Sequence, residues 1–205
     1  MKFSILKGAV AALAVCSDVV LSQLTATQIV RNIEQLELIS LDLKAPATFV
    51  DYLTQAQLIT LGHSNFDSIS GYLAKISQVA KMTVDEMQGM ETIPPGAEAD
   101  AILDAFRDFA KAHTTYFLSM SKAPAGVRLL LAGIMPMDNL LKADESSIDS
   151  LVLKLMETIP TGTGELKSYA DNISGQRKIA IKAWDLNLAQ KRSFGRAAFR
   201  QALRV

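Results

Sequence analysis

The stretch that decides the fold is Gly96–Lys122, GAEADAILDAFRDFAKAHTTYFLSMSK. One set of its side chains recurs every three or four positions, which is the period of a single face of an α-helix. Glu98 and Asp100 stand in the first turn, where the helix dipole favours acids, and Lys122 stands in the last turn. The stretch therefore predicts one amphipathic helix of about 25 residues. Its inward stripe is Ile102, Phe106, Phe109, His113, Phe117 and Met120.

The same period recurs in segments on both sides of this helix, at 25–44, 49–82, 127–159 and 164–186. Thr25 or Thr27 can cap the first segment, and Pro46 is expected to end it. Pro136 interrupts the fourth segment, so a short helix before a longer one is expected there. No segment alternates with period two. The sequence predicts an all-α fold, an antiparallel bundle of about five helices with no sheet.

The pentapeptide Met-Glu-Thr-Ile-Pro occurs twice, at Met90–Pro94 and Met156–Pro160. The flanking residues do not match, so a duplicated domain is not indicated. Each copy is followed within two residues by glycine, and proline disfavours helix in the residue before it. We expect both copies to act as helix stops.

The N-terminal segment has the features of a secretory signal peptide. Lys2 and Lys7 precede the apolar run Gly8–Cys16, which is too short to span a membrane. Cleavage is expected after Ser22, with Ala14 as a second site, and the alternative is an amphipathic first helix. The predicted organisation is therefore a signal peptide at 1–22, a helical bundle at 23–188 and a basic amphipathic or disordered tail at 189–205.

Composition limits the classes of function. Hydrophobic residues make up 49% of the 205-residue chain, and the net charge is zero, which does not favour nucleic acid. The single cysteine, Cys16, lies within the predicted signal peptide, so no disulfide is expected in the secreted protein. Asn172 begins an Asn-Ile-Ser glycosylation sequon, and a secreted chain would expose it to modification. The tail carries five basic residues and no acid.

Motifs for catalysis or metal binding are weak. Gly62–Phe66, GHSNF, begins like a nucleophile elbow but lacks the second glycine. His63 and His113 have no metal-ligand spacing, and each is expected to be a polar or core-edge helix residue. The adjacent acids Asp144 and Glu145, like Asp85 and Glu86, are expected on a solvated face. The sequence therefore predicts neither an enzyme nor a metal or cofactor site.

Four stretches carry a resemblance to a known family. They are TQIVRNIEQLELISLDL, ADAILDAFRDFAKAHTTYFLSMSK, SIDSLVLKLMETIP and the amphipathic segment ending at Trp184. In helix order and apolar spacing the chain from Thr25 to Trp184 resembles the fungal hydrophobic surface-binding protein A family, which includes cell-wall galactomannoproteins. The resemblance implies a secreted or cell-wall protein that binds fatty acids or other lipids, or adsorbs to hydrophobic surfaces. It also implies possible partners, namely cell-wall components or a secreted hydrolase.

Two hypotheses follow for function. In the first, a lipid lies inside the bundle against Phe106, Phe109, Phe117, Met120, Leu151 and Leu155, which share the apolar stripes of two long helices. In the second, the bundle is a scaffold for a protein partner, and the basic tail and acidic faces carry a secreted interaction or effector function.

Overall fold

The computed structural model describes residues 25–50, 55–122 and 137–184, and side chains over most of these ranges. Its described part is helical and contains no strand, as the sequence predicts. The helices are α1 (Ala26–Val50), α2 (Gln55–Glu86), α3 (Ala97–Lys122), α5 (Met137–Thr158) and α6 (Thr163–Trp184), with a 3-10 turn, η1 (Pro160–Gly162), between the last two. The short helix expected before Pro136, the signal peptide and the basic tail lie outside the described residues.

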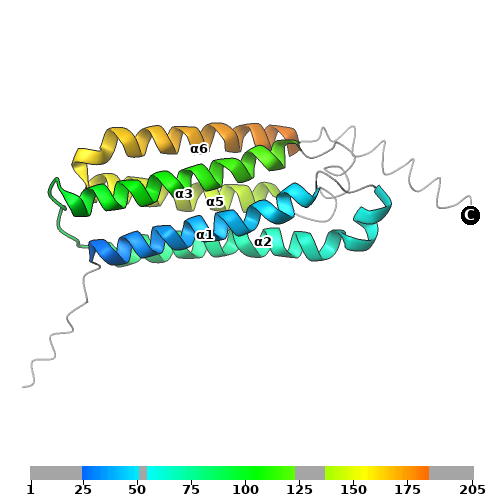
Figure 1. Cartoon of the computed structure of the whole chain (residues 1–205), viewed down its shortest axis with the longest axis horizontal. Helices are drawn as coiled ribbons and strands as arrows, with labels where there is room; N and C mark the ends of the chain where they lie inside the picture. The colour runs from blue at the N-terminus through cyan, green and yellow to red at the C-terminus, as the bar shows by residue number, and fades with distance from the viewer. Residues whose placement is uncertain (1–24, 51–54, 123–136, 185–205) are drawn as a thin grey trace, which may run out of the picture.

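The five helices form a closed ring. α1 packs between α2 and α3, α3 packs against α6, α6 against α5, and α5 against α2. Consecutive helices run in opposite directions, and this confirms the predicted antiparallel bundle. The ring also brings α2 and α5 side by side in the same direction, as it does α3 and α6 (Figure 1).

Helix ends follow the sequence at two sites. Thr25 caps α1, because its hydroxyl accepts from the Gln28 N–H at 3.3 Å and the Gln28 side chain accepts from the Thr25 N–H at 2.8 Å. At α3, Glu98 and Asp100 occupy the first turn and Lys122 the last. The Asp100 N–H donates to the Gly96 carbonyl, and Gly96 has a φ of 148°, which a side chain would disfavour.

The expectation that Pro46 ends the first helix is wrong, because α1 continues to Val50. Proline removes one N–H donor from the helix ladder and disfavours the turn before it. That cost is local, whereas extension of an already nucleated helix adds one hydrogen bond for each residue fixed. A long helix can therefore continue for a few residues beyond a proline near its end.

The two Met-Glu-Thr-Ile-Pro copies lie at the same end of the bundle and contact each other. The Ile93 N–H of the first copy donates to the Thr158 carbonyl of the second at 2.8 Å. Both copies therefore form one joint, which links the α2–α3 connection to the α5–α6 connection. We call Met90–Pro94 and Met156–Pro160 the METIP joint.

As helix stops, the two copies differ. The second copy ends α5 at Thr158, as expected. The first does not end a helix, because α2 stops earlier, at Glu86. A turn at Met87–Gly89 intervenes, with Gly89 in the left-handed region at φ 75°. The end of α2 is therefore set by Gly89 and not, as the sequence predicted, by Pro94.

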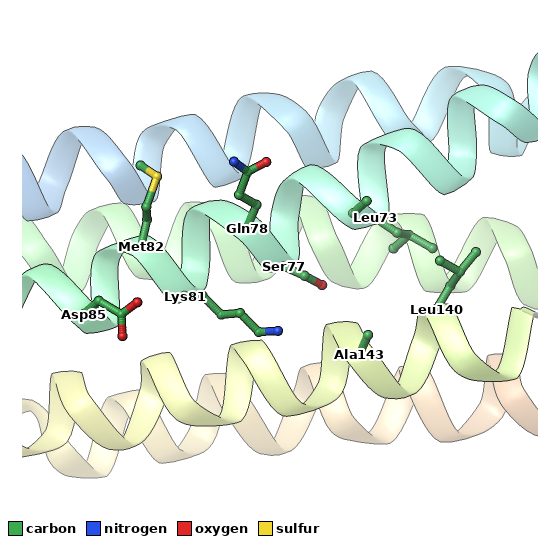
Figure 2. A pocket seen from close by; sticks show the side chains of 9 residues that line it. Leu73, Ser77, Gln78, Lys81, Met82, Asp85, Leu140 and Ala143 are labelled. Atoms are coloured by element: carbon green, nitrogen blue, oxygen red, sulfur yellow. The ribbon is translucent and has the colours of Figure 1, made fainter.

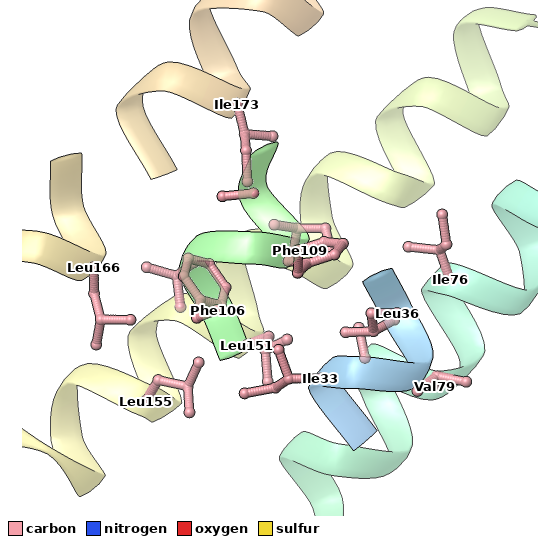
Figure 3. Close-up of a cluster of buried hydrophobic side chains, with 14 of the residues drawn as sticks. Ile33, Leu36, Ile76, Val79, Phe106, Phe109, Leu151, Leu155, Leu166 and Ile173 are labelled. Carbon is pink, nitrogen blue, oxygen red and sulfur yellow. The ribbon is translucent and has the colours of Figure 1, made fainter. Parts of the chain in front are cut away.

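The core runs the length of the ring and draws side chains from all five helices (Figure 3). Ile33 and Leu36 of α1 meet Ile76 and Val79 of α2 on one side of it. Each buried side chain of this kind contributes roughly 1.5–3 kcal/mol relative to an exposed one. The inward stripe predicted for α3 is buried in full, from Ile102 to Met120.

Candidate functional site

The six residues predicted to line a lipid site are all part of this core. Phe106, Phe109, Phe117, Met120, Leu151 and Leu155 are at most 1% exposed. Phe106 and Phe109 meet edge to face, with ring centroids 5.7 Å apart, and Leu151 and Leu155 face them from α5 (Figure 3). Their contact with a lipid remains a prediction. Asn172 is exposed on α6, where its glycosylation also remains a prediction.

A chain of buried polar side chains crosses the core beside these aromatic rings. Ser40 of α1, His113 of α3, Asp144 of α5 and Arg177 of α6 are each 0% exposed. Ser40 Oγ lies 3.2 Å from His113 Nδ1, and His113 Nε2 lies 3.2 Å from Asp144 Oδ2. Arg177 Nη2 lies 3.4 Å from the same Asp144 oxygen. We call these four residues the buried network.

The buried network overturns two sequence interpretations. Asp144 was expected on a solvated face, but it is fully buried, because it occupies an inward position of α5 between Leu141 and Ile148. Two expectations concerned His113: its place on the inward stripe of α3 is confirmed, whereas a position at the core edge is wrong, because His113 is fully buried. Glu145 is only partly exposed, while Asp85 and Glu86 are exposed as expected.

Sequence reasoning missed Arg177 altogether, although a signal was present. Arg177 stands on the apolar stripe of α6, four residues after Ile173 and three before Ala180. His113 and Asp144 interrupt the stripes of α3 and α5 in the same way. A buried charge requires a partner. Three polar interruptions of three inward stripes therefore indicate that these residues meet.

Around Arg177 the charges are not balanced. Its Nη1 lies 3.4 Å from Glu145 Oε1 and 3.9 Å from Asp149 Oδ1, so three carboxylates surround one guanidinium. The guanidinium also lies over the Phe117 ring, 5.5 Å from its centroid, which is the geometry of a cation–π contact. These contacts are ion pairs, and no guanidinium nitrogen of Arg177 makes a hydrogen bond to a described residue. One guanidinium and three carboxylates therefore lie close together between α5 and α6.

Burial shifts the titration of two neighbouring groups. Desolvation raises the pKa of the Tyr116 hydroxyl, and the nearby Asp144 carboxylate raises it further. Partial desolvation also raises the pKa of Asp149, which Arg177 lowers and Glu145 raises. Both shifts reflect the low polarity and the surplus of acid around the network.

Ser40, His113 and Asp144 share the composition of a hydrolytic triad, but their setting does not suit that chemistry. Such a serine must reach a substrate, next to N–H donors that stabilise an oxyanion. Ser40 is 0% exposed and lies inside α1, whose N–H groups bond within the helix. The GHSNF segment likewise lies within helix α2 instead of following a strand. We therefore interpret the buried network as structural.

A groove with a volume of about 510 Å³ lies between α2 and α5. Its walls include Leu73 and Ala74 from α2, and Leu140 and Ala143 from α5. Lys81 extends from α2 into the space between the two helices, and Ala143 points toward that space from α5 (Figure 2). The rest of its lining is polar or sulfur-containing, namely Ser77, Gln78, Met82 and Asp85.

Lys81 gives this groove a cation that no described residue pairs with. Its ammonium makes no ion pair or hydrogen bond with any described residue, although Asp85 stands one turn further along α2. A lysine ammonium offers three donors on a flexible stem. The α2–α5 groove thus combines apolar walls with an available positive charge.

A smaller groove of about 250 Å³ lies between α1 and α3. It is lined by Glu37, Leu41, Asp108, Lys111, Ala112 and Thr115. Here the lysine is engaged, since Lys111 Nζ lies 3.5 Å from Asp108 Oδ1. This groove is therefore more polar, and its cation is already paired.

The described ranges contain no group of three or more acids, histidines or cysteines placed to hold a metal ion, and the side chain of His63 lies outside these ranges. No described helix is long and apolar enough to cross a membrane. In comparisons with known proteins, no family model, no curated protein and no solved structure matches this chain.

Proposed function

We propose that this chain is a secreted, non-enzymatic helical-bundle protein that binds a fatty acid or similar single-chain lipid, and that it adsorbs to hydrophobic surfaces. The observation that carries the proposal is the α2–α5 groove, with its apolar walls and with Lys81, which has no ion-pair or hydrogen-bond partner among the described residues. A fatty acid has the matching chemistry, an alkyl chain with one carboxylate at its end.

The dimensions of the groove support this class of ligand. Sites for small molecules usually measure about 300–1,000 Å³ and are mostly apolar with a few polar groups. The groove, at about 510 Å³, falls within that range. Lys81 is the group placed to hold a carboxylate, while Leu73 and Leu140 are placed to contact the alkyl chain.

Energetics permit binding with few polar contacts. Each buried methylene contributes about 0.8 kcal/mol, so a sixteen-carbon chain supplies on the order of 12 kcal/mol if buried completely. Association costs about 4–15 kcal/mol, and an open groove buries only part of the chain. Micromolar affinity is a reasonable expectation for a ligand held in this way.

Adsorption to hydrophobic surfaces has separate support. Six large apolar side chains of the described residues are 42–63% exposed, and Met82 among them also lines the groove. Leu38 and Leu41 lie one turn apart on the outside of α1. Exposed apolar residues of this kind can contact an apolar solid or a lipid surface. The others are Leu118, Leu153 and Ile179.

The sequence resemblance agrees with the proposal but does not carry it. It rests on helix order and apolar spacing, and no family model matches the chain. Secretion, association with a cell wall, and a partner such as a hydrolase are proposed on that resemblance alone.

Native mass spectrometry tests the binding proposal. The protein would be purified from a secreting host, and organic extraction of one sample would identify any lipid already bound. A second sample would be mixed with palmitate. We expect close to one palmitate per chain, and a substitution of Lys81→Gln should weaken binding about tenfold, which corresponds to about 1.4 kcal/mol. Lys75→Gln is the matched control, because Lys75 lies on the same helix but outside the groove, 5.5 Å from the Tyr72 ring.

An uncharged ligand provides the second control. The methyl ester of palmitate keeps the alkyl chain but lacks the carboxylate, so its binding should not respond to Lys81→Gln. Protein that carries no lipid as isolated and takes up neither compound would contradict the proposal.

A further inference from the structure

We propose that α2 is a hinged flap, which swings away from α5 about the METIP joint while α1, α3, α5 and α6 stay together as one unit. The observation behind this inference is the unequal distribution of buried polar contacts over the five helices. That an acyl chain enters through this opening rests on the function proposed above.

Among the described side chains, the buried network joins four helices and includes no residue of α2. Ser40, His113, Asp144 and Arg177 belong to α1, α3, α5 and α6, in that order around their chain of contacts. These contacts are 3.2–3.4 Å long and fully buried. An apolar molecule inserted among these helices would separate charges at low polarity, which is costly. The network therefore resists any opening between the four helices that does not admit water.

The inner face of α2 is different over residues 67–86, where its side chains are described, because the buried residues there are almost all apolar. Ile69, Leu73, Ile76 and Val79 are no more than 7% exposed. The buried hydroxyl of Thr83 donates to the Val79 carbonyl of its own helix at 2.8 Å, so it requires no partner on another helix. An acyl chain placed along this face would replace one set of apolar contacts by another.

The end of α2 at Glu86 is attached to the rest of the bundle. Asn32 Nδ2 donates to Glu86 Oε2 at 3.2 Å, which links α2 to α1. Beyond the turn, the Ile93 N–H bonds the Thr158 carbonyl within the METIP joint at 2.8 Å. These contacts place a pivot at this end, so displacement of α2 should increase toward Leu73.

The groove lies along the seam that such a motion would widen. It runs between α2 and α5, and Leu73 and Leu140 line it away from the pivot (Figure 2). Phe109 and Phe117, by contrast, contact His113 of the buried network, at ring centroid distances of 5.2 and 4.7 Å. A ligand at those rings would disturb the network, whereas a ligand under α2 would not.

Amide hydrogen exchange on the ligand-free full-length chain, followed by mass spectrometry, tests the flap directly. Peptides covering residues 67–80 of α2 should exchange at least tenfold faster than those covering 105–118 of α3. Exchange that is equal in the two helices, or slower in α2, would overturn the inference. Because no lipid is present, failure of lipid binding and failure of the flap are separate results.

Ser40→Ala distinguishes the proposed arrangement from a uniformly loose bundle. This substitution removes the hydrogen bond between Ser40 and His113 and leaves the apolar core unchanged. Exchange at residues 105–118 should rise at least fivefold, while exchange at residues 67–80 should change less than twofold. Thr83→Val is the matched control, because its hydroxyl bonds within α2, and it should leave α3 unchanged. A parallel rise in both helices after Ser40→Ala would contradict the proposal.

Discussion

The helices on the two sides of this bundle associate through different kinds of contact. On one side, α1, α3, α5 and α6 meet around Ser40, His113, Asp144 and Arg177, which are linked across helix boundaries by two hydrogen bonds and one ion pair. On the other, α2 packs through apolar side chains and borders a groove. Polar contacts are short and directional, so they fix which helices meet and in which register. Apolar contacts tolerate displacement, and the proposed lipid binding requires such a boundary.

Removal of the carboxylate at the centre of the network should give the largest effect. Asp144→Ala leaves His113 and Arg177 without their shared buried partner, and we expect it to lower the free energy of unfolding by about 3–5 kcal/mol. Urea denaturation followed by circular dichroism would measure the change. The double substitution Asp144→Leu with Arg177→Met should recover much of the loss, because it removes both charges and keeps apolar volume. A loss below about 1 kcal/mol in Asp144→Ala would show that the network does not hold the four helices.

Two buried hydroxyls offer a direct comparison of the two sides. Ser40→Ala should cost about 1–3 kcal/mol, because it leaves His113 Nδ1 without its buried partner. Thr83→Val should cost less than about 1 kcal/mol, since the lost hydrogen bond lies within α2 and its carbonyl is already part of the helix ladder. Paired urea denaturation curves would measure both. Equal costs would remove the distinction between the two sides.

Two glycines that follow the METIP joint, Gly162 in η1 and Gly164 in α6, offer a further comparison. A Cβ at Gly162 would lie 2.5 Å from Leu103 Cδ2, so Gly162→Ala forces that side chain to move and should cost about 1 kcal/mol. Gly164→Ala meets nothing within 4 Å and lies in helix α6, so it should stabilise the protein by about 0.5–1 kcal/mol. Thermal unfolding of the two variants should therefore shift in opposite directions. Destabilisation by both would indicate strain that the contacts at Gly162 do not explain.

The smallest effect concerns pH at the α5–α6 boundary. Partial burial raises the pKa of Asp149, so its charged form is disfavoured in the folded protein and the associated stability is lost as pH rises through the folded pKa. Asp149→Asn should therefore raise stability at pH 7, and should have no such effect at pH 3. The carboxylate is 59% exposed, which limits the gain to less than about 0.5 kcal/mol. Destabilisation at pH 7 would mean that attraction to Arg177 outweighs burial.

How far the sequence predicts this molecule depends on the kind of feature. Helical period placed Ile102, Phe106 and Phe109 in the core, because an apolar stripe has few alternatives to burial. The stop of α2 was misplaced, because the helix ends at Glu86 and Gly89, five residues before Pro94, turns the chain in the left-handed region at φ 75°.

The candidate sites were harder to predict, for different reasons. The buried network needs His113, Asp144 and Arg177 to meet from three helices, and no local pattern gives the helix order around the ring. The groove depends on the spacing between α2 and α5, which no local sequence pattern gives. From sequence alone, Lys81 is indistinguishable from an ordinary surface lysine. The sequence does contain one polar residue within each inward apolar stripe, namely His113, Asp144 and Arg177. The expectation that these three buried polar residues contact one another would have indicated the network.

The most direct test of the account locates the lipid itself. Palmitate carrying a photoreactive diazirine on its chain would be bound to the protein, irradiated, and its cross-links mapped by peptide sequencing. We expect the labels on residues that line the α2–α5 groove, around Leu73, Ser77, Leu140 and Ala143. Labels on Phe106, Phe109 or Phe117 with none on α2 would contradict the account, because they would place the lipid beside the buried network.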